Sequence, residues 1–290
     1  MPYNYAHALA GREALTKCPK TVAETALSHA DAFYLGTLGP DPYYGDLLLP
    51  FPPWDVRADL ADTLHNASPR ALFSALLELC MGDAALVSYA LGFACHLALD
   101  MAVHPYIEGR YPGKRHSPAE IAMDWPLVQR LGGWPACAPK DFYELTDLQK
   151  IDALHAGVLR ALTGAGRTGL YARALQKWIR VNTFTFNGSG KKSKDPLFLP
   201  LTALLVGPRG AKETARLLNL THTAWRAPFS PPPSPSPSTD AVRTSSVPEL
   251  VMLGAARAAE AMTALCGAFS GGSRETALSA AETYCDHDRF

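Results

Sequence analysis

Three residues of metal-binding type follow one another at four-residue intervals in the segment GFACHLALDMAVHPY, namely His96, Asp100 and His104. Residues four apart lie on the same face of an α-helix, so each neighbouring pair in this set shares one face. A rise of about 1.5 Å per residue separates the first from the last by about 12 Å along the helix axis. One small ion can hardly take all three as ligands, so the spacing predicts more than one ion if these residues are ligands.

Further candidate ligands lie on both sides of this segment. Downstream, His116 and Glu120 repeat the i, i+4 spacing, which allows the pair to chelate a single ion from one helix face or from its N-terminal edge. Three more candidates lie upstream among apolar neighbours: His7, Asp41 and His65.

The residue types in this set indicate which metal they suit. An ionised carboxylate such as Asp100 or Glu120 is costly to bury on an apolar helix face unless it is paired or coordinates a cation. A metal-free polar network is the alternative, but it would bury many ionisable groups without a compensating charge. Imidazole and carboxylate ligands without nearby thiolates favour zinc, with manganese or iron as poorer alternatives.

The elements that position these residues are predicted to be helices, because Ala and Leu recur at helical spacing and no strand alternation is present. The stretch 83–104 is apolar on most faces and is expected to be the buried central helix. The Gly- and Pro-rich segment 36–55 predicts an ordered but irregular loop. The remaining predicted helices cover residues 5–18, 20–35, 55–66, 69–80, 147–163, 169–180, 197–206, 210–219, 247–268 and 274–284.

Composition favours one folded domain over residues 1–290. Hydrophobic residues make up 48% of the 290 residues and charged residues 19%, which is typical of a globular chain. The low-complexity segment at about 231–246 predicts a flexible Pro/Ser-rich insertion, because the roughly 45 residues after it are too few for a typical independent domain.

Charge and hydropathy bear on partners and location. Lys plus Arg and Asp plus Glu are both 27, so no net basic field attracts nucleic acid. No obligate protein partner is evident from the sequence. The N-terminus lacks the apolar core of a signal peptide, and no uninterrupted apolar run of about 18 residues is present. We therefore expect a cytoplasmic location.

The candidate ligands form an ordered set of motifs: His7, the GPD loop with Asp41, His65, the HxxxDxxxH motif followed by Pro and an aromatic residue, and the HxxxE motif. This ordered set resembles the zinc-dependent phospholipase C family, which is related to S1/P1-type nucleases. The resemblance is strong over roughly residues 1–125 and weaker beyond. It implies an all-α, single multi-helix domain of the phospholipase C/P1 nuclease type that binds two or three zinc ions. It also implies the ligand sets: Asp41, His65, His96 and Asp100 at one ion, His104, His116 and Glu120 at a second, and Asp100 bridging to a third that is shared with His7.

The activity implied is hydrolysis of a phosphodiester by a metal-activated water. Asp41 is the candidate catalytic residue, either as a ligand or as the group that orients or deprotonates that water. The expected substrate is a phospholipid or a small phosphodiester, with transient contact at a membrane surface. Two alternatives remain: a single-strand-type nuclease with the same metal cluster, which should offer basic and stacking aromatic residues along a groove, and a non-catalytic, metal-stabilised lipid-binding scaffold.

Overall fold

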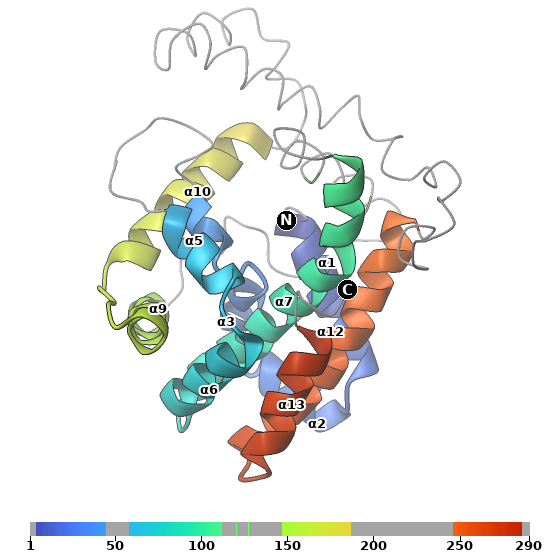
Figure 1. Ribbon diagram of the computed structural model, residues 1–290, viewed down its shortest axis with the longest axis vertical. Helices are drawn as coiled ribbons and strands as arrows, with labels where there is room; N and C mark the ends of the chain where they lie inside the picture. The colour runs from blue at the N-terminus through green and yellow to red at the C-terminus, as the bar shows by residue number, and fades with distance from the viewer. Residues whose placement is uncertain are drawn as a thin grey trace, which may run out of the picture.

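In the computed structural model, residues 4–44, 58–111, 120, 127, 147–186 and 246–285 are described, and every regular element in these ranges is helical (Figure 1). The predicted all-α fold is confirmed. The predicted helices 197–206 and 210–219, residue His116 and the predicted insertion up to residue 245 lie outside the described ranges. The elements are α1 (Asn4–Lys17), α2 (Lys20–Leu27), α3 (Ala30–Gly36), the short 3-10 helix η1 (Asp41–Tyr44), α5 (Ala58–His65), α6 (Pro69–Cys80), α7 (Ala84–Arg110), α9 (Leu148–Thr163), α10 (Leu170–Phe186), α12 (Val247–Phe269) and α13 (Arg274–Tyr284).

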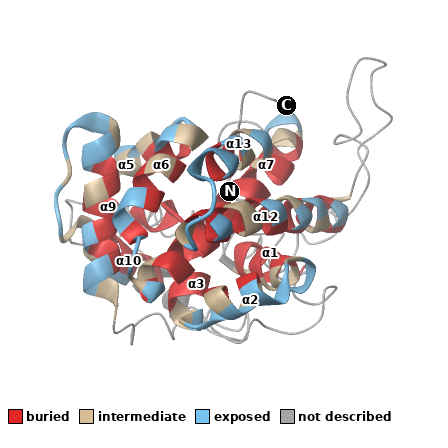
Figure 2. Cartoon of the chain, turned by 90° about the horizontal axis from the view of Figure 1, so that it is seen from below, coloured by how far each residue is buried: buried red, intermediate tan, exposed pale blue. Residues whose placement is uncertain are grey.

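The central helix is α7, as the sequence predicts, and most of its residues are buried (Figure 2). Its start is fixed by Asp83, whose side chain accepts hydrogen bonds from the backbone N–H groups of Ala85 and Leu86. The helix continues through Pro105 to Arg110, six residues beyond the predicted end at residue 104. Burial of Tyr106 and Ile107 against neighbouring helices explains why packing extends the helix past a proline.

The helix α3 crosses α7 at very short range, because glycines meet at the crossing. A Cβ atom on Gly92 would lie 2.0 Å from the carbonyl oxygen of Phe33, and a Cβ atom on Gly36 would lie 2.2 Å from the carbonyl oxygen of Tyr89. Only glycine allows this backbone contact. The single helix predicted over 20–35 is therefore wrong: the chain breaks at His29, so that α3 can turn onto α7.

Segments from both ends of the described chain meet on α7. The helix α12 packs along α7 and also contacts α1, and both helices flank α7 in Figure 1. On the other side, α10 packs against η1 and α9, and α9 packs against α6. Of the irregular loop predicted over 36–55, residues 41–44 form η1 and residues 45–57 lie outside the described part.

By length and mean hydropathy, α7 and α12 are each long and apolar enough to cross a membrane. The expectation from the sequence rested only on uninterrupted apolar runs, which isolated polar residues such as Ser88 and His96 break. It therefore did not identify α7 as a candidate membrane span. Within the protein, 94% of the apolar window of α7 and 56% of that of α12 are buried. The hydropathy of α7 is thus accounted for by its position in the core.

Candidate metal centre

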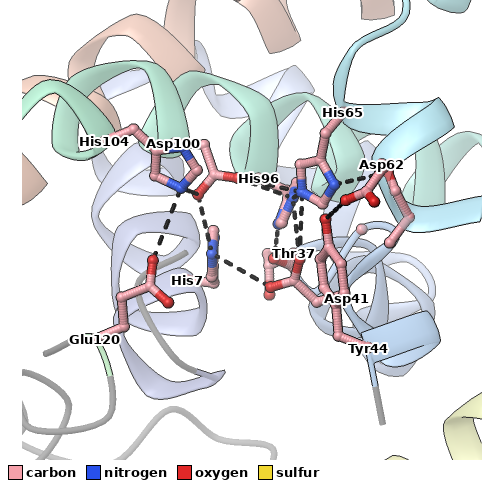
Figure 3. Close-up of polar contacts among 12 residues, drawn as sticks. His7, Thr37, Asp41, Tyr44, Asp62, His65, His96, Asp100, His104 and Glu120 are labelled. Atoms are coloured by element: carbon pink, nitrogen blue, oxygen red, sulfur yellow. Dashed lines mark hydrogen bonds and ion pairs between the residues drawn. The ribbon is translucent and has the colours of Figure 1, made fainter. Parts of the chain in front are cut away.

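Six of the predicted ligands come together from four elements near the middle of α7 (Figure 3). All of them are buried except His104, whose side chain is 13% exposed. Glu120 reaches the same region and is also buried, whereas His116 lies outside the described residues. The contributing residues are His7 of α1, Asp41 at the start of η1, His65 at the end of α5, and His96, Asp100 and His104 of α7.

Four donor atoms lie close to one another where α5, η1 and α7 meet. The Nε2 atom of His65 lies 3.3 Å from Asp41 Oδ1, 3.5 Å from Asp100 Oδ2 and 3.1 Å from His96 Nε2. The Nε2 atom of His96 lies 3.7 Å from Asp41 Oδ1 and 3.3 Å from Asp100 Oδ2. With metal–ligand bonds of about 2.0–2.1 Å, two ligand atoms of a tetrahedral zinc ion lie about 3.3–3.4 Å apart. The spacing of His65, His96 and Asp100 fits three ligands of a zinc ion, and Asp41 Oδ1 lies beside two of them, His65 and His96.

Backbone carbonyls orient the two imidazoles of this group. The Nδ1 atom of His96 lies 3.2 Å from the carbonyl oxygen of Thr37, and the Nδ1 atom of His65 lies 2.9 Å from the carbonyl oxygen of Ala61. A carbonyl oxygen only accepts, so each Nδ1 carries a hydrogen and donates it. In the neutral ring Nε2 then bears a lone pair, which is the form that binds a metal.

On the opposite side of Asp100, a second group of donors continues toward Glu120 (Figure 3). The Oδ1 atom of Asp100 lies 3.4 Å from His7 Nε2 and 3.6 Å from His104 Nε2. The Oδ2 atom of Asp41 lies 3.8 Å from His7 Nε2, and Glu120 Oε1 lies 3.9 Å from His104 Nε2. Asp100 and Asp41 therefore each direct one oxygen to the first group and the other oxygen to the second, as a bridging carboxylate would.

Electrostatics distinguish the histidines. Burial lowers the pKa of His7 and of His96 to about 4, so both rings are neutral and able to bind a cation. Burial also lowers the pKa of His65, but its contacts with Asp100 and Asp41 outweigh this effect and raise it to about 10. The two carboxylates thus attract a positive charge to the point where His65 and His96 meet. A metal ion there would supply that charge.

The buried polar atoms also fit a metal ion. Neither ring nitrogen of His7, neither oxygen of Asp100 and not the Oδ1 atom of Asp41 has a hydrogen-bond partner among the described residues. Buried polar atoms are almost always satisfied, so a cluster of such atoms calls for a ligand. Two overlapping sets of donor atoms are close enough to hold an ion, namely His7, Asp41 and His96, and His65, His96 and Asp100, and the sets share His96.

Sequence reasoning did not identify the groups that hold these ligands in place. The carbonyls of Thr37 and Ala61 carry no side-chain signal. Tyr44 stacks on the ring of His65 with the ring centroids 5.7 Å apart, and its hydroxyl donates to Asp62 Oδ1 at 2.6 Å. In the sequence, Tyr44 is one residue of the Gly- and Pro-rich segment 36–55, and nothing in its spacing relates it to His65.

The helical fold and the buried cluster of histidines and carboxylates define an all-α protein with a candidate polynuclear metal centre. The model of the family described as zinc dependent phospholipase C matches residues 6–161, more than half of the 290 residues. The chain therefore belongs to the zinc-dependent phospholipase C family, and the resemblance inferred from its motifs is confirmed. Comparisons with curated proteins and with solved structures found no match.

Proposed function

We propose that this chain is a zinc-dependent phosphodiester hydrolase of the phospholipase C type. The observation that supports this most strongly is the spacing of the donor atoms of His65, His96 and Asp100, which fits three ligands of a zinc ion, with the Asp41 carboxylate beside His65 and His96. Membership of the family supports a hydrolase that depends on zinc. The proposed ligands of two or three zinc ions are His7, Asp41, His65, His96, Asp100, His104, His116 and Glu120.

Each residue has a role in this proposal. When bound, the ions supply Lewis acidity toward a phosphoryl oxygen and lower the pKa of a coordinated water. Asp100 directs one oxygen to each group of donors and would therefore hold an ion in each group close to the other. Asp41 is proposed to be essential, either as a ligand or as the base that orients the attacking water.

The proposed substrate is a phospholipid or a small phosphodiester, reached by transient contact with a membrane surface and in the cytoplasm. The family supports a lipid substrate. A single-strand-type nuclease remains the first alternative, and the equal numbers of acidic and basic residues disfavour it. A metal-stabilised lipid-binding scaffold without turnover is the second.

A single domain over residues 1–290 is part of the proposal. The support is the packing of α12, from the C-terminal part of the chain, on both α7 and α1. The Pro/Ser-rich segment at about 231–246 would then be an insertion within this domain.

The test is metal content by mass spectrometry on untagged protein, compared between wild type, Asp100→Ala and Glu78→Gln. Glu78 is an exposed carboxylate on α6 and serves as the control. We expect two or three zinc ions in wild type and in the control, and their loss in Asp100→Ala. The same samples are assayed on a chromogenic phosphocholine ester and on a single-stranded oligonucleotide.

The outcomes separate the candidates. Hydrolysis of the phosphocholine ester by wild type and control alone supports the phospholipase C proposal. Cleavage of the oligonucleotide alone indicates a nuclease, and zinc without any turnover indicates a scaffold. A folded wild type that contains no metal after incubation with zinc would refute the central proposal.

A further inference from the structure

A buried chain of three side chains outside the candidate ligands ends on the turn that carries Asp41. The Oη atom of Tyr171, on α10, lies 3.3 Å from the carbonyl oxygen of Gly39. The Oη atom of Tyr89, on α7, lies 3.3 Å from that of Tyr171, and Nε2 of His155, on α9, lies 2.6 Å from Oη of Tyr89. Tyr171 and Tyr89 are completely buried, and His155 is 3% exposed.

Only one arrangement of hydrogens satisfies all three links. The carbonyl of Gly39 can only accept, so Tyr171 donates to it. Tyr89 must then donate to Tyr171, because the hydrogen of Tyr171 is already used. The last link therefore requires His155 to donate through Nε2 to the oxygen of Tyr89.

The remaining nitrogen of His155 agrees with this direction. With Nε2 carrying the hydrogen of a neutral ring, Nδ1 bears a lone pair, and Nδ1 is buried without a hydrogen-bond partner in the described structure. Burial lowers the pKa of His155 to about 3, which keeps the ring neutral. The ring also stacks on Tyr171 with the centroids 3.6 Å apart, so its plane is fixed.

The turn at the end of this chain contacts His96 at two points. The carbonyl of Thr37 accepts from Nδ1 of His96, and the Cα of Gly39 lies so close that a Cβ atom there would be 2.6 Å from the imidazole ring. Gly39 has a φ of +52°, and Asp41 follows two residues later. A shift of the Gly39 peptide would therefore move the support of His96 together with the carboxylate of Asp41.

We propose that His155, Tyr89 and Tyr171 are positioning residues for the metal centre, and that they act by fixing the Gly39 carbonyl and thereby the orientation of His96 and Asp41. This inference rests on the proposed zinc centre. Outer partners of metal ligands typically change metal affinity by about 10- to 100-fold when they are removed. If these residues only packed the core, substituting them would lower the stability of the protein and leave the metal centre unchanged.

The test uses Tyr171→Phe, which keeps the ring and removes the bond to Gly39, and Tyr89→Phe, which interrupts the chain one step earlier. Tyr284→Phe on α13 is the control, because α13 contributes no candidate ligand. Zinc dissociation constants are measured by chelator competition, and the visible absorption of the cobalt-substituted protein reports ligand geometry. We expect about a 10- to 100-fold loss of zinc affinity and an altered cobalt spectrum in both variants, and wild-type values in the control.

We also expect the effects of the two substitutions on zinc affinity to be non-additive, because Tyr89 acts through Tyr171. A variant with lower thermal stability but wild-type zinc affinity and cobalt spectrum would overturn the inference while leaving the proposed function intact. A wild type that binds no zinc would overturn both.

A measurement on the unmodified protein guards against variants that fail to fold. In protein carrying ¹⁵N-labelled histidine, NMR distinguishes the two ring tautomers. We expect His155 to be in the Nε2–H form. The Nδ1–H form would break the proposed direction of the chain and overturn the inference.

Discussion

The Nε2 atoms of His65 and His96 lie 3.1 Å apart, and the Nδ1 atom of each ring is held by a backbone carbonyl. Two neutral rings in this arrangement would direct lone pairs at each other, and two carboxylates lie beside them. The pair is stable only with a positive charge between or beside the rings. A proton on His65 or a metal ion provides that charge.

Zinc is therefore expected to stabilise the folded protein. A ligand that binds only the folded state at a free concentration of 100 times its dissociation constant adds about 2.7 kcal/mol. We expect a higher melting temperature with zinc than after removal of metal by a chelator, measured by calorimetry. Magnesium at the same concentration serves as the control, because it prefers an all-oxygen octahedral site. An unchanged melting temperature with zinc would contradict the fit of these donors to zinc.

The two groups of donors predict different metal losses for two substitutions. His104→Ala removes a donor of the group near Glu120 and leaves Asp41, His65, His96 and Asp100 in place, so we expect the loss of one ion. Asp100→Ala removes the carboxylate common to both groups, so we expect the loss of all ions. Metal content per chain gives the answer.

Glu108→Gln is the matched control for His104→Ala. Its carboxylate lies 4.0 Å from His104 Nδ1, but the side chain is 65% exposed. We expect full metal content in this variant. Equal losses in His104→Ala and Asp100→Ala would mean that the two groups do not bind separate ions.

The N-cap of α7 predicts a pH-dependent contribution to stability. Asp83 accepts hydrogen bonds from the start of α7, and its ion pair with Lys150 at 2.9 Å together with these bonds holds its pKa below the usual value. A folded-state pKa below that of the unfolded chain means that the contribution is complete above about pH 4 and is lost as the pH falls through the folded-state pKa. Asp83→Ala should lower the free energy of unfolding by about 1 kcal/mol at pH 7.

Urea unfolding at pH 7 and near pH 3 checks this expectation. The difference between wild type and Asp83→Ala should shrink at the lower pH. Asp83→Asn keeps a good capping residue and loses only the ion pair with the exposed Lys150, so its loss at pH 7 should be smaller. A difference that is independent of pH would contradict the role of the charge.

The crossing of α3 and α7 predicts that alanine substitutions at two glycines of α7 have opposite effects on the free energy of unfolding. Gly92→Ala places a methyl group against the backbone of Phe33, which cannot move aside, so we expect a loss of about 3 kcal/mol in the free energy of unfolding. Gly109→Ala meets nothing within 4 Å and should raise it by up to about 1 kcal/mol. Thermal or urea unfolding distinguishes the two, and a tolerated Gly92→Ala would show that the helices are less closely packed.

The part of the fold and of the site that could be predicted follows from the local spacing of residues along the sequence. The i, i+4 pattern predicts that His96, Asp100 and His104 share one helix face, and the apolar run around them predicts a buried helix. The approach of His7 to Asp100 depends on how α1 packs against α7, and the periodicity of the sequence does not predict this packing. The break at His29 follows from the contact between Gly36 and Gly92, which is a tertiary effect on a locally helical sequence. Nothing in the sequence distinguishes His155 from an ordinary core histidine, because its partner Tyr89 lies 66 residues away.

The position of three proposed ligands on one uninterrupted helix has a consequence for how the chain can vary. Inserting one residue between His96 and Asp100 would turn the following ligands by about 100° and shift them by about 1.5 Å, away from His65 and His7. The interval from residue 96 to residue 104 can therefore not change in length without separating these ligands.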